Sequence, residues 1–105
     1  MSSPEHPVQR LDDIVHQRVR LGILAVLSEA DRADFTYLRN ALGLTDGNLS
    51  RHLSVLEEAG LVEVRKIFEA KKPRTWVKPT SDGRAALATE VAALRELIDR
   101  CEGRR

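Results

Sequence analysis

Apolar residues recur every three or four positions in four stretches of the chain, which is the spacing of one helix face. The first stretch begins at Leu11 and runs into LGILAVL (residues 21–27), which is apolar on every side. The other stretches span residues 35–42, 46–59 and 81–102. A capping residue precedes each of these, and a glycine follows two of them, so the pattern predicts four helices with the end signals Asp34, Gly43, Thr45, Gly60 and Thr80.

The periodicity changes after residue 60. The segment LVEVRKIFE (residues 61–69) is rich in β-branched and apolar residues, AKKP interrupts it, and RTWVK (residues 74–78) can return as a second strand. The two helices before this hairpin are joined by residues 43–45 alone, which is typical of a helix-turn-helix. We therefore predict a mainly α-helical domain with a β-hairpin wing over residues 10–102, preceded by a flexible arm, residues 1–9.

The helix predicted over residues 46–59 has an unusual polar side. Leucines at 49, 53 and 56 form its core stripe, and His52 at the edge of that stripe is expected to be partly buried with a hydrogen bond. The opposite side is short and hydrogen-bonding, as in a helix that lies in a DNA major groove, where an arginine can bind guanine with two hydrogen bonds. The helix start can also bind a phosphate. The candidate DNA contacts are Thr45, Gly47, Asn48, Ser50, Arg51 and Ser54.

Arg51 has a second interpretation as an ordinary solvated arginine, which is the default for an exposed arginine. The small neighbours on its face favour the DNA contact. An alternative function for the whole face is docking on a partner protein, but such a face should expose apolar or aromatic anchors.

The basic residues are concentrated in the predicted wing. Residues 61–79 hold six basic and two acidic side chains, a net charge of +4, whereas residues 1–60 have a net charge of −3. Lys71, Lys72 and Arg74 surround the predicted hairpin turn, where they can contact DNA phosphates. The alternative is an ordinary solubilising hairpin tip. Trp76 is expected to pack onto the helices rather than to stack on bases.

The last helix carries apolar residues at spacings of four and three, which is a short heptad seam. This seam can pack on its own domain or on a second chain. Because LGILAVL also needs cover on more than one side, a homodimer is favoured, with the candidate interface residues Leu21, Leu24, Leu87, Val91, Leu94 and Ile98.

Composition narrows the remaining possibilities. The 105 residues suit one domain, the single cysteine excludes an intrachain disulfide, and no apolar run is long enough to span a membrane. We expect a soluble, cytoplasmic protein. The sequence shows no Ser/His/Asp set, glycine-rich phosphate loop or histidine spacing for a metal, so we expect neither an enzyme nor a cofactor or metal site.

One stretch also resembles a known family. The turn GLT, followed by NLSRHLSVLEEAGLVEVRK and PRTWVKPTSDGRAAL, resembles the winged helix-turn-helix of transcriptional regulators of the ArsR and MarR type over about residues 10–100. The resemblance implies a DNA-binding homodimer, a recognition helix at residues 46–59, and a wing whose tip touches the DNA backbone or minor groove. The Cys-x-Cys motif and the C-terminal histidines of metal-sensing members are absent from the matching stretches.

These observations predict a transcriptional regulator that binds double-stranded DNA at an inverted repeat as a homodimer. A winged-helix module for protein contacts is the alternative. The sequence leaves open the operator, any effector, and whether binding represses or activates.

Overall fold

The computed structural model describes residues 5–103, and within them the four predicted helices and the predicted hairpin follow one another in the predicted order. A 3-10 helix η1 (Pro7–Arg10) precedes four α-helices and a three-stranded antiparallel sheet. The helices are α1 (Arg18–Ser28), α2 (Phe35–Leu42), α3 (Asp46–Glu58) and α4 (Ser81–Cys101); the strands are β1 (Ala33–Asp34), β2 (Val62–Glu69) and β3 (Lys72–Pro79). The predicted fold class, a mainly α-helical winged helix-turn-helix, is confirmed.

The predicted helix starts after residue 33 are confirmed in atomic detail. The side chain of Asp34 accepts a hydrogen bond from the backbone N–H of Tyr37 at 2.7 Å, and Thr45 and Thr80 cap α3 and α4 in the same way. Gly43 ends α2 with a left-handed φ of 64°, which glycine adopts without a steric penalty. These signals fix the short turn between α2 and α3.

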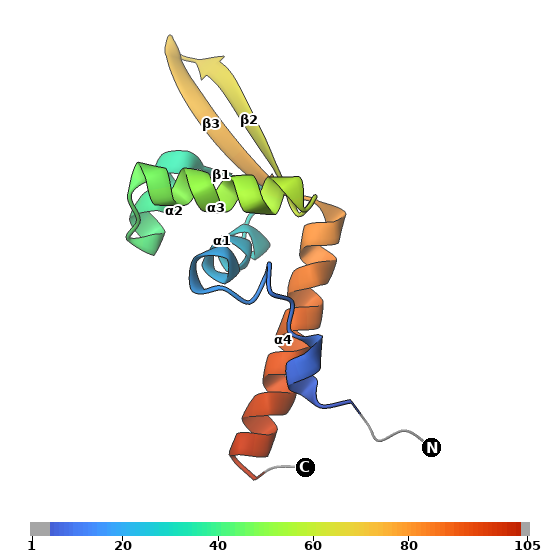
Figure 1. The fold of residues 1–105 in the computed structure, drawn as a ribbon. Helices are drawn as coiled ribbons and strands as arrows, with labels where there is room; N and C mark the ends of the chain where they lie inside the picture. Colours follow the sequence, from blue (N-terminus) through green and yellow to red (C-terminus); the bar gives the residue numbers. More distant parts are fainter. Residues whose placement is uncertain (1–4, 104–105) are drawn as a thin grey trace.

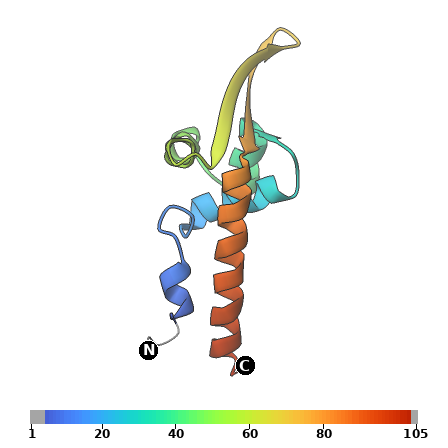
Figure 2. The ribbon, with the colours of Figure 1, turned by 90° about the vertical axis from the view of Figure 1, so that its right-hand side faces the viewer.

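The core lies where α1, α3 and the base of the hairpin meet (Figure 1). The hairpin projects from one side of this core, and α4 extends away in the opposite direction (Figure 2). Side chains from all three elements are buried here, among them Ile23, Leu24, Leu27, Leu49, Leu56, Val62 and Val77. Much of the apolar surface of LGILAVL is therefore covered within one chain.

The prediction that the first helix begins near Leu11 is wrong. Helix α1 begins at Arg18, because Gln17 is extended and its side-chain oxygen accepts from the first free backbone N–H groups, those of Val19 and Arg20, at 2.9 Å. The preceding residues form turns, yet Val15 is still fully buried. The apolar spacing between Leu11 and Gln17 therefore reflects the burial of single residues and not a helix.

The two long strands form a hairpin whose alternate residues face opposite sides. The inner face, which lies toward α3, carries Val62, Val64, Lys66 and Phe68 of β2 and their partners Pro79, Val77, Thr75 and Pro73 of β3. The outer face carries Glu63, Arg65, Ile67 and Glu69 with Lys78, Trp76, Arg74 and Lys72. The hairpin turns at Ala70 and Lys71, which have φ of 48° and 65°. Strand β1, which the sequence did not predict, pairs with β3 at Val77 and Trp76.

Helix α4 contacts the rest of the chain near its start and again farther along its length. Near its start, a Cβ added to Gly83 would lie 2.0 Å from the carbonyl oxygen of Leu61, so only glycine allows this contact. Farther along, the N-terminal segment lies beside α4, where His16 Nδ1 is 2.6 Å from a carboxylate oxygen of the buried Glu90. Arg10 also forms an ion pair with Glu96.

Residues 7–9 of the predicted flexible arm have a defined place in the structure. They belong to η1, which packs against α4 with Pro7 buried. The first four residues of the predicted arm lie outside the described residues. Within residues 5–103, no helix combines the length and the apolar character that a membrane span requires.

Candidate nucleic-acid interface

Helix α3 presents the predicted polar side to solvent. Its leucines at 49, 53 and 56 are buried, whereas the predicted contact residues Thr45, Gly47, Asn48, Ser50, Arg51 and Ser54 are all exposed. The guanidinium of Arg51 reaches the side-chain oxygen of Asn48 only at 3.5 Å, the outer limit of a hydrogen bond. Arg51 is therefore able to turn toward a ligand outside the chain.

Gly47 has no packing role in this helix. A Cβ built on it would meet no atom within 4 Å, and its φ is not positive, so nothing inside the chain requires a glycine there. Its use is explained if an external surface approaches the backbone of α3 closely.

Two of the three acidic residues of α3, Asp46 and Glu57, have partners, and the third, Glu58, is exposed. Asp46 forms an ion pair of 2.8 Å with Arg39 of α2, a residue that the sequence analysis missed. Glu57 accepts a hydrogen bond from the backbone N–H of Val64 at 3.3 Å. These contacts reduce the repulsion that free carboxylates would exert on a polyanion.

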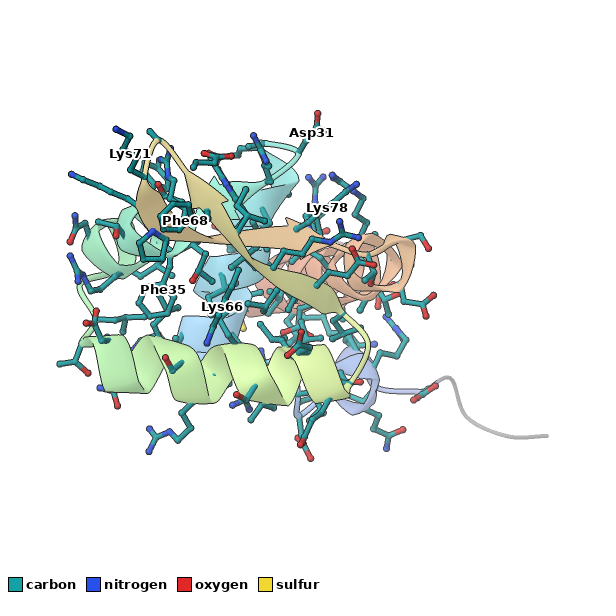
Figure 3. The ribbon with its side chains drawn as sticks, turned by 90° about the horizontal axis from the view of Figure 1, so that it is seen from above. Asp31, Phe35, Lys66, Phe68, Lys71 and Lys78 are labelled. Atoms are coloured by element: carbon teal, nitrogen blue, oxygen red, sulfur yellow. The ribbon has the colours of Figure 1, made fainter. Side chains whose placement is uncertain are left out.

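A cleft of about 470 Å³ separates α3 from the inner face of the wing. Its walls include Ser50 and Ser54 of α3 and Lys66 and Thr75 of the hairpin. Figure 3 shows the side chains of Lys66 and Phe35 in this region, between the hairpin and α3. Lys66 was not predicted as a contact residue, although strand alternation would have placed it on the same face as the buried Val62 and the half-buried Val64.

The three basic residues predicted to act together at the wing tip are in different surroundings. Lys71, which Figure 3 shows at the tip of the hairpin, and Lys72 are both exposed, and in residues 5–103 neither has an ion pair. Arg74 lies on the outer face, 2.6 Å from a carboxylate oxygen of Asp34 and 3.5 Å from one of Glu69. Arg74 therefore connects the wing to the start of α2 through two internal ion pairs.

The contact between Asp34 and Arg74 also affects the pKa of the Asp34 carboxyl. The backbone N–H of Tyr37 and the Arg74 guanidinium hold the pKa of the Asp34 carboxyl below its ordinary value. The carboxylate thus caps α2 with one oxygen and binds the wing with the other.

Trp76 does not pack onto the helices as predicted. It lies on the outer face, where the guanidinium carbons of Arg32 and Arg74 are 3.8 Å and 4.8 Å from its ring centroid. Its indole nitrogen is buried without a hydrogen-bond partner in the described part of the chain. The sequence alone does not give the register of β3 relative to the core, so it could not show which face of the hairpin carries Trp76.

The prediction that His52 is partly buried with a hydrogen-bond partner is confirmed. It is 9% exposed, and its Nδ1 lies 3.1 Å from a guanidinium nitrogen of Arg20. Burial, together with the charges of Arg20 and Arg51, lowers the pKa of the His52 imidazole. Across residues 5–103, no three His, Cys, Asp or Glu side chains come together as a metal site would require.

The candidate dimer residues are also divided between two environments. Leu24 is only 2% exposed inside the chain's own core and has almost no surface left for a partner. Leu21, Leu87 and Leu94 are half-buried, while Val91 and Ile98 of α4 are 37% and 53% exposed. The accessible part of the predicted seam is therefore the distal part of α4.

The helix pair α2–α3 followed by the β2–β3 wing and a supporting α-helix is the architecture of a winged helix-turn-helix domain. The family model of the winged helix DNA-binding domain matches residues 19–98. The chain belongs to this family.

Several relatives cover most of the chain. An uncharacterized protein of Methanocaldococcus jannaschii is 38% identical over 89 residues, which are 85% of this chain and 97% of that protein. The structure of a transcriptional regulator homologue from Pyrococcus horikoshii is 33% identical with a TM-score of 0.86, covering 92% of this chain and 98% of the other. The predicted family resemblance is confirmed.

Two further solved structures extend the comparison. The M. tuberculosis transcriptional regulator MOSR, solved in complex with DNA, is 25% identical with a TM-score of 0.71, covering 92% of this chain and 69% of that one. A MarR-family regulator from Silicibacter pomeroyi shares the fold at 24% identity with a TM-score of 0.66, covering 91% of this chain and 64% of the other. The three solved structures are thus those of transcriptional regulators or a homologue of one, and the Silicibacter pomeroyi protein is a MarR-family member.

Proposed function

We propose that this protein is a cytoplasmic transcriptional regulator that binds an inverted-repeat DNA operator as a homodimer. The observation that carries the proposal is the exposed side of α3. Most of its predicted contact residues are short and polar, and Gly47 among them has no packing role inside the chain. A major groove, about 12 Å wide, admits such a helix and offers base edges to its side chains.

Within this proposal, Arg51 reads a base edge. It is the longest side chain among the predicted contacts on α3 and has only a weak internal contact. Arginine commonly binds the O6 and N7 atoms of guanine with two hydrogen bonds. Ser50, Ser54 and Asn48 then contact neighbouring base edges or phosphates, and the backbone N–H groups at the start of α3 face a phosphate.

The wing supplies contacts that do not depend on sequence. Lys66 lies on the inner face of the wing, Lys71 lies at the hairpin turn, and Lys72 begins β3 on the outer face, so exposed lysines surround the outer half of the wing. Lysines that neutralise phosphates release counterions, and each contact contributes to the salt dependence of binding. Arg74 is left out of this set because its partners are Asp34 and Glu69.

Dimerisation uses α4. Val91 and Ile98 are exposed on the seam that Leu87 and Leu94 continue, and Leu21 of α1 is half-buried, whereas Leu24 is covered within the chain. Two copies that associate through this seam would bury apolar side chains that one copy leaves in water. A two-fold dimer presents two equal recognition helices, which explains an inverted repeat with half-sites about 10 bp apart, or a multiple of that spacing.

The dimer interface has a direct test. Ile98→Asp places a charge in the apolar seam without disturbing the monomer core, so light scattering should report a monomer at micromolar concentration. Ala92→Asp is the matched control, because Ala92 is an exposed small residue on another side of the same helix. A dimer that survives Ile98→Asp would place the interface elsewhere.

Selection of bound duplexes from a random pool, followed by footprinting, tests the function itself. The expected outcome is an enriched palindrome protected on two half-sites. A single asymmetric half-site protected at saturation would contradict a two-fold dimer on DNA. No enrichment at all would contradict sequence-specific binding and favour a protein-docking role for the winged helix.

A further inference from the structure

Phe68 has an exposure that the fold does not explain. Its side chain is 74% exposed, more than Tyr37 at 59% or Ile98 at 53%, and it does not belong to the core or to the residues packed against it. It lies on the inner face of the wing, two residues before the turn, with Pro73 directly opposite on β3 (Figure 3). The tip of the wing therefore presents an apolar pair to solvent on the side of α3.

The charges around this apolar pair favour an anionic partner. Lys66 lies on the same face and Lys71 and Lys72 lie at the turn, none of them with an ion pair within residues 5–103. Glu69, the nearest acidic residue in sequence, is on the outer face and is paired with Arg74. An apolar surface surrounded by lysines matches the chemistry of DNA. Its phosphates can bind the lysines, and its stacked bases offer an apolar surface to Phe68.

The length of the hairpin fits one place on DNA. Phe68 is six residues beyond Val62 at the base of β2. At about 3.3 Å per residue, the side chain is about 20 Å from the base of the wing. Half a helical turn of DNA is about 17 Å, which separates a major groove from the next minor groove on the same side of the duplex. With α3 in the major groove, the tip of the wing can reach that minor groove.

We propose that Phe68, supported by Pro73, is an apolar wedge that enters this minor groove and partly unstacks one base step. This inference rests on the proposed function, since it requires α3 to occupy the adjacent major groove. Proteins that bind the minor groove insert phenylalanine, leucine or proline between base steps and bend the duplex toward the major groove. The lysines beside Phe68 hold the phosphates on either side of the opened step.

The wedge adds sequence selectivity without a hydrogen bond to a base. Pyrimidine–purine steps such as TA and CA unstack easily, whereas A-tracts are stiff. The protein should therefore prefer a flexible step about half a helical turn outside each Arg51 contact. Selectivity at this position would come from the free energy of deforming the DNA.

The test uses duplexes that keep the selected half-sites and vary only the step beneath the wing tip. The unmodified protein should bind a duplex with TA or CA at this step about tenfold more tightly than one with an A-tract step, a difference within the range for one mismatched base pair. Dyes at the two duplex ends should report a larger bend, by energy transfer, for the flexible step. Phe68→Ala should remove both the step preference and the additional bend.

Two further variants control for indirect effects. Phe68→Leu keeps an apolar wedge and should retain most of the step preference. Ile67→Ala removes an apolar residue from the same strand on the outer face and should leave the preference unchanged. Thermal melting should be nearly equal for the unmodified protein and Phe68→Ala, because an exposed side chain contributes little burial.

The outcomes separate this inference from the proposed function. If the unmodified protein selects no sequence at all, the proposed function fails. If it selects half-sites but Phe68→Ala keeps the same step preference and bend, the wedge alone is overturned. A change of oligomeric state in Phe68→Ala, measured by light scattering, would also overturn the wedge, because Phe68 would then contact a second copy of the chain.

Discussion

Helix α3 and the wing form one continuous surface, but different interactions hold them in place. Three leucines of α3, at 49, 53 and 56, are 3% exposed or less and fix the helix from below. The outer half of the wing has no such core. It depends on strand pairing and on Arg74, which joins β3 to Asp34 and Glu69.

This difference matches the two tasks proposed for the surface. A helix that reads base edges must keep its side chains within hydrogen-bonding geometry, which apolar burial ensures at any ionic strength. A wing that binds phosphates and a deformable groove can tolerate movement. Its position depends on ion pairs, which salt and acid weaken.

The largest difference in the free energy of unfolding is expected between an apolar substitution in α3 and one in the wing. Leu56→Ala removes a fully buried side chain beneath α3 and should lower the free energy of unfolding by about 2–5 kcal/mol. Phe68→Ala should change it very little. Chemical denaturation of both variants checks this, and a similar loss in both would mean that Phe68 packs in the folded protein.

A smaller effect is expected where the wing joins α2. Asp34→Ala removes an N-cap and should cost about 0.5–2 kcal/mol. Asp34→Asn keeps a capping oxygen but loses the charge that binds Arg74, so it should loosen the wing with little loss of overall stability. Hydrogen exchange of β3 measures the loosening; equal protection in Asp34→Asn and the unmodified protein would show that Arg74 does not restrain the wing.

His52 of α3 and Asp34, which binds the wing through Arg74, should affect stability in different pH ranges. Because the folded-state pKa of His52 is lowered, its stabilising effect is complete above the ordinary histidine pKa of about 6.5 and is lost as the pH falls through the lower folded-state value. The pKa of Asp34 is lowered too, so its contribution persists above the ordinary value of 3.8 and is lost only in stronger acid.

Melting temperatures of the unmodified protein and His52→Gln between pH 8 and pH 5 test the first of these ranges. The decline of the melting temperature on acidification should be smaller in His52→Gln. Parallel curves would show that His52 is protonated as easily in the folded chain as in the unfolded one.

The smallest effect is expected at the hairpin turn. Ala70 has a φ of 48°, a left-handed conformation that asparagine tolerates better than alanine. Ala70→Asn should therefore stabilise the protein by up to about 1 kcal/mol, and thermal denaturation should show a small rise in melting temperature. A fall would mean that the turn relaxes to another conformation.

The sequence predicted those features that depend on neighbouring residues. The caps Asp34, Thr45 and Thr80 act within three residues of themselves, and the leucine stripe of α3 has a helical period, so both could be read locally. The exposed polar side of α3 followed directly from that stripe.

Features that depend on distant residues were missed. Arg74 meets Asp34 across 40 positions, and no local pattern indicates this pair. The two-residue strand β1 is too short to have a period, and the faces of Trp76 and Phe68 depend on which wing residues meet the core. Val15 enters the core from an irregular segment, so its apolar character alone suggested a helix that does not exist.

The most direct test of the division between α3 and the wing compares Arg51→Ala with the double variant Lys71→Ala/Lys72→Ala on the selected duplex and a scrambled one at several salt concentrations. Arg51→Ala should cost about 1–3 kcal/mol per half-site on the selected duplex and relax the choice at one base position. The double variant should weaken both duplexes equally and reduce the salt slope by about two per half-site. The account would be contradicted if Arg51→Ala weakened both duplexes alike while the lysine variant changed base preference.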